Sequence, residues 1–379
     1  MVRKKRKMRK FTQFLIVLLF IGLGYFVWSN FTAKEEPVPP FVFVPKDPID
    51  YRDEGGQFEL PLNGSSGYAS VLTPMYKDAS ENSEIKAIMA AGQVFTIRRE
   101  QGAWWYIEMD GMSGWIQHRF ALINLPDVIP SIVYDIKNAY ASDLQSSGKP
   151  IPNITGVQLY DAKAYNQRFE SEEFIVPILY ATALKVQKAQ DLALENGETL
   201  LVHEAYRPAF AQKQIVDAMR SLVEQDEVVK QGVSQAPWSM VWFIATGVSN
   251  HQRGYALDMS LAKVLETKLK VSGDYQYADV TKYEEYAMPS AFHELSVASV
   301  TFTEPVDSYS DSAWRMSIFA SSMNQAAKDL QTYSTKAGLT PLASEWWHFN
   351  DLAQELDVKA SGNVGKYQIR TNQSVVPKS

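Results

Sequence analysis

The 379-residue chain contains no cysteine and only five histidines. The absence of cysteine excludes disulfide bonds and thiolate metal sites, so a transition-metal site in this protein must use histidine and carboxylate ligands. Nothing in the composition is extreme, which argues against a disordered or fibrous chain. The net charge of −6 gives no reason to expect a nucleic-acid partner.

The N-terminus is the one strongly basic region. Seven of the first ten residues are Lys or Arg, and the segment Phe11–Trp28 that follows carries no charge. A cleaved signal peptide would have a shorter apolar region and a small-residue cleavage site, and a buried helix would show a polar face. An uncleaved transmembrane anchor fits better. We therefore expect residues 1–30 to form a cytoplasmic basic tail and a membrane helix, with the rest of the chain outside the cytoplasm.

Two further regions precede the main domain. Prolines concentrated between residues 37 and 61 predict a stalk over residues 31–67. Aromatic alternations separated by glycine turns then predict a small β-barrel over residues 68–125. The pieces Trp105–Glu108, Asp110-Gly111 and Gly114–Ile116 resemble bacterial SH3 domains. The resemblance implies binding of cell-wall peptides, and a purely structural barrel is an equal alternative.

Residues 130–360 mix helical and strand patterns. Apolar residues at helical spacing predict helices over residues 176–197, 209–225 and 312–338, and short apolar runs predict strands at residues 199–208 and 345–349. This mixture predicts an α+β domain in which helices flank a small antiparallel sheet. The polar tail, residues 361–379, is expected to be loose.

The stretch SNHQRGYALDMS, Ser249–Ser260, places a histidine and an aspartate around a glycine. Gly254 permits a turn that can bring His251 back towards Asp258 on the strand that follows. Burying the Asp258 carboxylate is costly unless it is paired or binds a metal. A hydrogen-bonded structural pair is the more common arrangement for an isolated His and Asp, and that alternative stays open.

A third ligand is available in EWWHFND. A hydrolytic zinc ion usually has three protein ligands and an open position for water, whose pKa it lowers to about 7. His251, Asp258 and His348 satisfy this requirement and leave Glu345 free. We expect Glu345 to act as the general base that takes a proton from water and passes it to the leaving amine.

The other three histidines lack such a setting. The pair His-Glu occurs at His203 and at His293, but neither histidine is followed by a second one four residues later, so the HExxH zinc motif is absent. His118 falls in the expected barrel. We interpret these three as surface or hydrogen-bonded core histidines.

Three motifs occur in order: Tyr206-Arg207-Pro208, the SxHxxGxAxD pattern of residues 249–258, and the ExWH pattern of residues 345–348. Together they resemble the zinc D-alanyl-D-alanine dipeptidase and carboxypeptidase family, which includes the dipeptidases of vancomycin-resistance systems. The resemblance implies that His251, Asp258 and His348 hold one zinc ion and that Glu345 is the base. It also implies that Arg207 stabilises the oxyanion, whereas a surface arginine beside a helix is the alternative.

The substrate prediction depends on one departure from the family. The dipeptidase branch has an acid after Phe in a segment where this chain has Phe292-His293. A free dipeptide carries an ammonium group that is costly to bury unpaired. We therefore expect a carboxypeptidase that acts on the D-Ala-D-Ala end of peptidoglycan stem peptides. A dipeptidase acting on free D-Ala-D-Ala and an inactive peptidoglycan-binding protein are the alternatives.

Overall fold

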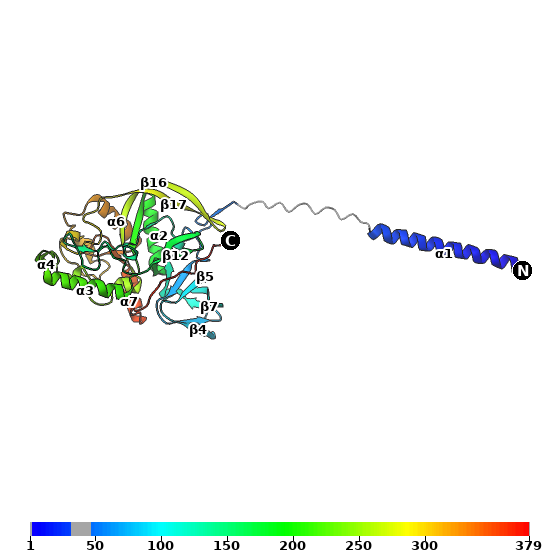
Figure 1. Ribbon diagram of the computed structural model, residues 1–379, viewed down its shortest axis with the longest axis horizontal. Helices are drawn as coiled ribbons and strands as arrows, with labels where there is room; N and C mark the ends of the chain where they lie inside the picture. The colour runs from blue at the N-terminus through cyan, green and yellow to red at the C-terminus, as the bar shows by residue number, and fades with distance from the viewer. Residues whose placement is uncertain (1, 32–46, 379) are drawn as a thin grey trace. The chain divides into compact units, whose positions relative to one another are not determined.

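The computed structural model describes residues 2–31 and 47–378, which belong to two compact units, Met1–Lys46 and Asp47–Ser379 (Figure 1). In the first unit, α1 spans Val2–Phe31. Some side chains of the expected anchor, Phe11–Trp28, lie outside the described residues. Within the described part of the chain, no helix is both long enough and apolar enough to cross a membrane, so the anchor is not confirmed.

The barrel is built on an eight-stranded sheet with the order β14-β8-β2-β5-β6-β7-β3-β4. Its strands are β2 (Ser66–Ala69), β3 (Thr73–Tyr76), β4 (Ile85–Met89), β5 (Val94–Gln101), β6 (Trp104–Met109), β7 (Met112–Gln117), β8 (Ala121–Asn124) and β14 (Pro177–Leu179). The turn between β6 and β7 is Asp110-Gly111, whose φ angles of 49° and 77° are the positive values that a tight hairpin requires. Trp105, Ile107 and Met109 alternate into the core. The small β-barrel predicted from the sequence is therefore present.

A second, seven-stranded sheet forms the centre of the α+β domain. Its main path is β1-β17-β16-β15-β9, and β19 joins it by pairing with β16 and β18. The strands are β1 (Ile49–Asp50), β9 (Val133–Tyr134), β15 (Glu198–Glu204), β16 (Ala256–Ser272), β17 (Tyr275–Glu285), β18 (Thr340–Pro341) and β19 (His348–Asn350). Two separate hairpins pair β10 (Gln145–Ser146) with β11 (Lys149–Pro150), and β12 (Lys163–Asn166) with β13 (Ser171–Phe174).

Helices surround this sheet (Figure 1). They are α2 (Tyr180–Leu194), α3 (Ala209–Gln225), α4 (Glu227–Ser234), α5 (Asn250–Arg253), α6 (Gln325–Ala337) and α7 (Leu352–Ala360). Helices α2 and α6 pack on each other, α2 also contacts β15, and α6 also contacts β16. The predicted α+β class is confirmed. The sheet is not purely antiparallel as predicted, because β1 pairs with β17 and β9 pairs with β15 in parallel.

The third predicted helix, residues 312–338, begins later than expected. The structure has only a single 3-10 turn at Ala313–Met316, and α6 starts at Gln325. Asn324 caps α6 by accepting a hydrogen bond from the Ala327 N–H, and Gly338 ends it with a φ of 96°. Before the cap, Met316 and Ile318 are exposed, so the apolar residues that suggested an earlier helix start are not gathered on one buried face.

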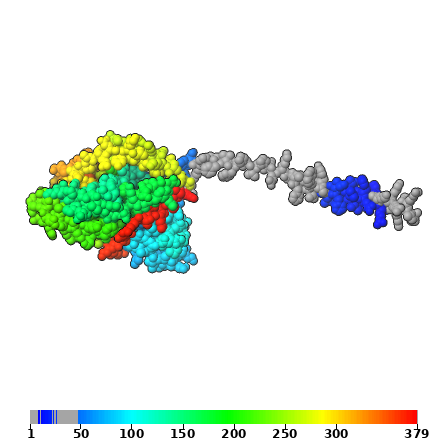
Figure 2. Space-filling view, in the orientation of Figure 1, coloured from blue at the N-terminus to red at the C-terminus, as the bar shows by residue number. Residues whose placement is uncertain are grey.

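Two segments that the sequence suggests are free are packed instead. Residues 32–46 of the expected stalk lie outside the described residues. In the part of it that the structure describes, Phe58 and Leu60 are buried, and β1 joins the sheet beside β17. At the other end of the chain, Tyr367 stacks on Tyr206 with ring centroids 5.2 Å apart. Figure 2 shows this C-terminal segment, in red, lying between the barrel and the green part of the α+β domain. The apolar residues in the segment supply the burial that a loose tail would lack.

Candidate metal centre

His251 is held by a short, firmly capped helix. The Ser249 hydroxyl accepts the Gln252 N–H, and the Gln252 side chain accepts the Ser249 N–H, which is a capping box. Gly254 ends the helix with a φ of 79°, and a Cβ there would lie 2.5 Å from Leu122 of the barrel. The His251 Nδ1–H donates to the Ala205 carbonyl at 2.7 Å. A ring with its proton on Nδ1 has its Nε2 lone pair available for a metal, on the side of the ring that faces Asp258.

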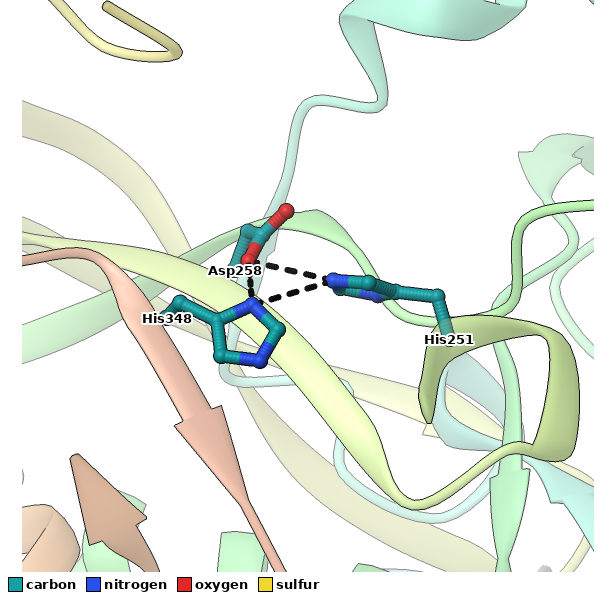
Figure 3. Close-up of side chains that lie close together, drawn as sticks. All are labelled: His251, Asp258 and His348. Atoms are coloured by element: carbon teal, nitrogen blue, oxygen red, sulfur yellow. Dashed lines mark hydrogen bonds and ion pairs between the residues drawn. The ribbon is translucent and has the colours of Figure 1, made fainter. Parts of the chain in front are cut away.

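Asp258 and His348 meet because their strands are neighbours. Asp258 on β16 lies directly opposite His348 on β19, so the two side chains project from the same face of the sheet. The His348 Nδ1 is 2.9 Å from the Asp258 Oδ1 and 3.1 Å from the His251 Nε2 (Figure 3). The His251 Nε2 is 3.4 Å from the same oxygen. All three side chains are buried.

The protonation of the two rings suits a metal ion. The His348 Nε2–H donates to the Asn350 amide oxygen at 3.1 Å, which leaves its Nδ1 with a lone pair. Two imidazole lone pairs and a carboxylate oxygen then converge, with the three ligand atoms within 4.8 Å of one another. These atoms lie so close that a cation or a shared proton must stand between them. Two imidazoles with one carboxylate match zinc, whereas calcium and magnesium prefer oxygen ligands.

Glu345 lies beside the three residues, as the sequence predicts. Its Oε2 is 3.7 Å from the His348 Nδ1, and its side chain is almost buried. Burial raises the pKa of Glu345 to about 7. A carboxyl group with this pKa can take up and release a proton near neutral pH, which is what a general base requires.

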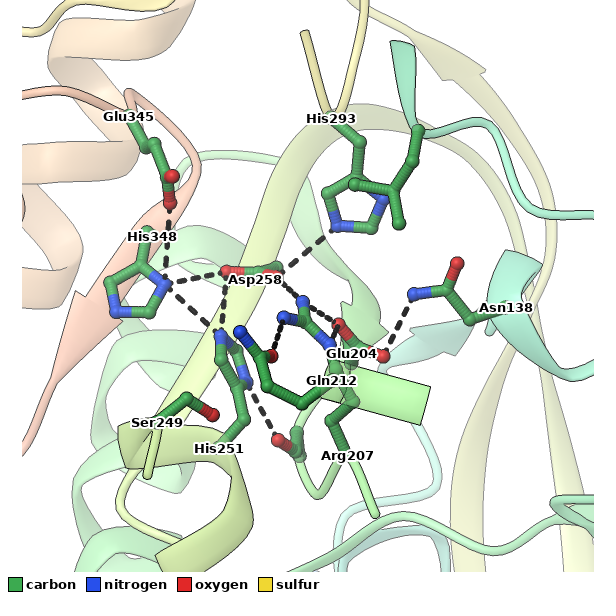
Figure 4. Close-up of polar contacts among 12 residues, drawn as sticks. Asn138, Glu204, Arg207, Gln212, Ser249, His251, Asp258, His293, Glu345 and His348 are labelled. Carbon is green, nitrogen blue, oxygen red and sulfur yellow. Dashed lines mark hydrogen bonds and ion pairs between the residues drawn. The ribbon is translucent and has the colours of Figure 1, made fainter. Parts of the chain in front are cut away.

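Arg207 is buried in the same site and is not a surface residue. Its Nε–H and one Nη2–H donate to the Glu204 Oε2, its Nη1–H donates to the Gln212 Oε1 at 2.7 Å, and Nη2 lies 3.6 Å from the Asp258 Oδ2 (Figure 4). Burial would lower the pKa of Arg207, but the Glu204 carboxylate outweighs it and raises the pKa. The guanidinium is thus charged and fixed beside the candidate ligands.

These side chains line one cleft of about 370 Å³. Its floor is formed by the three candidate ligands, Glu345 and Arg207, and its wall includes Val241, Trp242, Tyr309 and Lys359. Val241 and Tyr309 are 65% and 71% exposed, so the cleft reaches the surface of the protein at these residues. A cleft of this size accommodates a small ligand or the end of a longer one.

His293 lies closer to the candidate ligands than its sequence context indicates. It is buried, its Nδ1–H donates to the Asp143 Oδ1 at 2.8 Å, and its Nε2–H donates to the Asp258 Oδ2 at 3.2 Å. Burial lowers the pKa of His293, but Asp143 and Asp258 outweigh it and raise the pKa to about 10. His293 is thus a hydrogen-bonded core histidine, one of the two alternatives given for it, and the structure adds that one of its partners is the candidate ligand Asp258. The departure at Phe292-His293 was the signal that marks it.

The other two histidines lie where that interpretation places them. His203 is buried, with its Nε2 2.8 Å from the Ser260 hydroxyl and its Nδ1 3.2 Å from the Asp135 carbonyl. His118 is half-buried on the barrel, where its Nε2 donates to the Gly102 carbonyl at 2.9 Å.

Glu204 is a second site residue that the sequence motifs do not reveal. It lies opposite Asp258 across the β15–β16 pair, and its Oε1 accepts hydrogen bonds from Asn138 at 2.8 Å and Tyr160 at 2.7 Å. The strand register alone places it there, which sequence patterns do not specify at single-residue precision.

Comparison with known proteins identifies the barrel. Residues 69–120 match the family model described as Bacterial SH3 domain, which confirms the interpretation of this region. A search of curated proteins finds no match to the chain. The family match covers the barrel and none of the metal-centre residues, so the resemblance to zinc D,D-peptidases stays a prediction, and what is established is that the chain carries a bacterial SH3 domain.

Proposed function

We propose that this protein is a zinc-dependent D,D-peptidase that hydrolyses the D-Ala-D-Ala end of peptidoglycan stem peptides. The observation that carries the proposal is the convergence of His251, Asp258 and His348, with ligand atoms within 4.8 Å, on the floor of a cleft that also contains Glu345. The three ordered sequence motifs support the substrate class. The bacterial SH3 domain supports peptidoglycan or protein as a partner.

The three proposed ligands are His251, Asp258 and His348. A zinc ion bound there would polarise the scissile carbonyl and favour attack by water at neutral pH. The Ala205 carbonyl and the Asn350 amide orient the two rings by accepting their outer N–H groups. Outer partners of this kind fix the tautomer that a metal ligand needs.

Glu345 and Arg207 would perform the remaining chemistry. Glu345 would accept a proton from the attacking water and deliver it to the leaving amine, which its pKa of about 7 permits. Arg207 would stabilise the negative charge that develops on the substrate oxygen. Glu204 and Gln212 hold its guanidinium in place beforehand, so little reorganisation is needed during the reaction.

The substrate end we propose is acylated. A free dipeptide carries an ammonium group, and the position at which the dipeptidase branch has an acid is occupied here by His293, which offers no carboxylate. An ammonium group buried without such a partner is unfavourable. A stem peptide has an amide at this position and can leave the cleft at the exposed Val241 and Tyr309.

The location we propose is outside the cytoplasm, where stem peptides occur. The uncharged run Phe11–Trp28 behind a basic N-terminus supports export with a retained N-terminal membrane segment. Separating cells into membrane and soluble fractions, with and without residues 1–30, tests this. Recovery of the full chain in the cytoplasm would contradict it.

The test of the reaction uses the purified full chain with a stem pentapeptide ending in D-Ala-D-Ala and, separately, with free D-Ala-D-Ala. We expect release of D-Ala from the pentapeptide, loss of release with a chelator, and recovery when zinc is restored. Glu345→Gln is the matched control, because it should keep the metal and lose turnover. Faster cleavage of the free dipeptide would indicate a dipeptidase, and peptide binding without metal-dependent cleavage would indicate a binding protein.

A further inference from the structure

We propose that His293 is a positioning residue of the proposed metal centre. It holds the Asp258 Oδ2 and so directs the Asp258 Oδ1 towards the metal position beside His251 and His348. The proposal rests on the proposed metal site. It assigns a role to His293, which stands where the dipeptidase branch of the resembled family has an acid.

The two oxygens of Asp258 have separate partners. Oδ1 is 2.9 Å from the His348 Nδ1 and 3.4 Å from the His251 Nε2, so it faces the proposed metal position. Oδ2 accepts the His293 Nε2–H at 3.2 Å. A carboxylate that is held through one oxygen cannot rotate freely. Its other oxygen is then the one that can bind the metal, as a monodentate ligand.

His293 is itself held from both sides. Asp143 accepts its Nδ1–H at 2.8 Å, and the Gln145 N–H donates to its carbonyl at 3.2 Å. The ring lies against Phe292 and Trp347, with centroid distances of 4.2 Å and 6.0 Å. Both ring nitrogens donate to carboxylates, so His293 has no free lone pair with which to bind a metal.

The backbone of His293 adds a second, independent observation. Its φ is 55°, in the left-handed region that side chains other than glycine rarely adopt. Such a conformation is unfavourable and persists only where the surroundings impose it. Here it turns the imidazole into the buried site between Asp143 and Asp258, which is consistent with a role that depends on the direction of the ring.

The experiment measures zinc affinity of the purified full chain by competition with a chromophoric chelator. We expect His293→Ala to bind zinc roughly 10–100-fold more weakly, the loss typical of removing a partner of a metal ligand. The visible absorption of the cobalt-loaded chain should also change, because that spectrum reports ligand geometry. His293→Gln, whose amide N–H can still reach Asp258, should recover part of the affinity.

His203→Ala is the matched control. His203 is equally buried and also bonded through both ring nitrogens, but its partners are Ser260 and the Asp135 carbonyl instead of Asp258. We expect its zinc affinity and cobalt spectrum to equal those of the wild type. If His293→Ala fails to fold, Asp143→Asn carries the test, since the Asp143 side chain is partly exposed and its loss should weaken zinc binding in the same direction.

The outcomes separate the two proposals. Wild-type zinc affinity and an unchanged cobalt spectrum in the His293 and Asp143 variants would overturn the positioning role and leave the metal site intact. A wild-type chain that binds no zinc would overturn both. Equal losses in the His203 and His293 variants would also overturn the positioning role, because they would show a general effect of disturbing the core.

Discussion

Two clusters of acids and histidines share Asp258, and only one of them is suited to hold a metal. The first is His251, Asp258 and His348, and the second is Glu204, Asp258 and His293. Each brings its possible ligand atoms within 4.8 Å of one another, and each is buried. The two clusters are therefore alike in spacing and burial, and each combines histidine with carboxylate. They differ in having two histidines or one, and in whether a positively charged side chain already binds the carboxylates.

In the first cluster, both histidines donate their outer N–H groups to neutral acceptors, which leaves two lone pairs facing the carboxylate. In the second cluster, positively charged side chains already bind the carboxylates. Arg207 binds the Glu204 Oε2, and His293 donates protons to two carboxylates. Burial would raise the pKa of Glu204, but Arg207 outweighs it and lowers the pKa. Charge balance, as well as ligand type, therefore distinguishes the candidate metal site from the ion-pair network.

The largest effect on zinc content should follow from removing one proposed ligand of the first cluster. We expect His348→Ala to lower the zinc content from about one ion per chain to near zero, since a catalytic site of this type needs all three protein ligands. Turnover should be lost with the metal. Metal analysis after dialysis measures this, with Glu204→Gln compared in parallel. Zinc lost from the Glu204 variant and kept in the His348 variant would reverse the assignment of the two clusters.

The second cluster can be broken by removing its cation. Arg207→Met leaves the buried Glu204 carboxylate without its partner, which should lower the free energy of unfolding by about 3–5 kcal/mol. Denaturant unfolding of the metal-free chain measures the loss. The double variant Arg207→Met with Glu204→Gln should be more stable than Arg207→Met alone, because the uncompensated charge is gone. Equal stability of the two would show that Arg207 does not compensate Glu204.

A smaller change can loosen the first cluster alone. Gly254 has a φ of 79° and lies against Leu122, so Gly254→Ala forces both strain and a clash behind the helix that carries His251. The cost should be on the order of 1–3 kcal/mol, together with weaker zinc binding. Gly111→Ala is a suitable control, since its φ is also positive but a Cβ there meets nothing within 4 Å. It should reduce stability without changing zinc affinity.

The two clusters also differ in how far the sequence reveals them. His251, Asp258, Glu345 and His348 could be predicted because each lies in a compact motif with fixed spacing. Glu204 could not, because the strand register that brings it to Asp258 is not specified by sequence patterns. For His293 the sequence shows only the departure from the family's acid, and the contact with Asp258 could not be predicted. The same limit applies to the fold. Local periodicity predicted α3 and the barrel strands, whereas burial of the C-terminal segment depends on contacts with residues more than 150 positions away, such as Tyr206 with Tyr367.

Glu59 is a second buried carboxyl group. Among the described residues it has no positively charged partner such as the Arg207 that pairs with Glu204. It accepts hydrogen bonds from the Ser131 N–H and hydroxyl, and burial raises its pKa to about 7. Because the folded pKa exceeds the unfolded value of 4.5, this group stabilises the fold fully below about pH 4.5, and the contribution is lost as the pH rises through 7. Glu59→Gln should remove this dependence, so the difference in unfolding free energy between wild type and variant should shift in favour of the variant from pH 5 to pH 8. A constant difference over that range would show that Glu59 titrates normally, and that a buried carboxyl in this protein does not need a cation such as Arg207 to stay ionised.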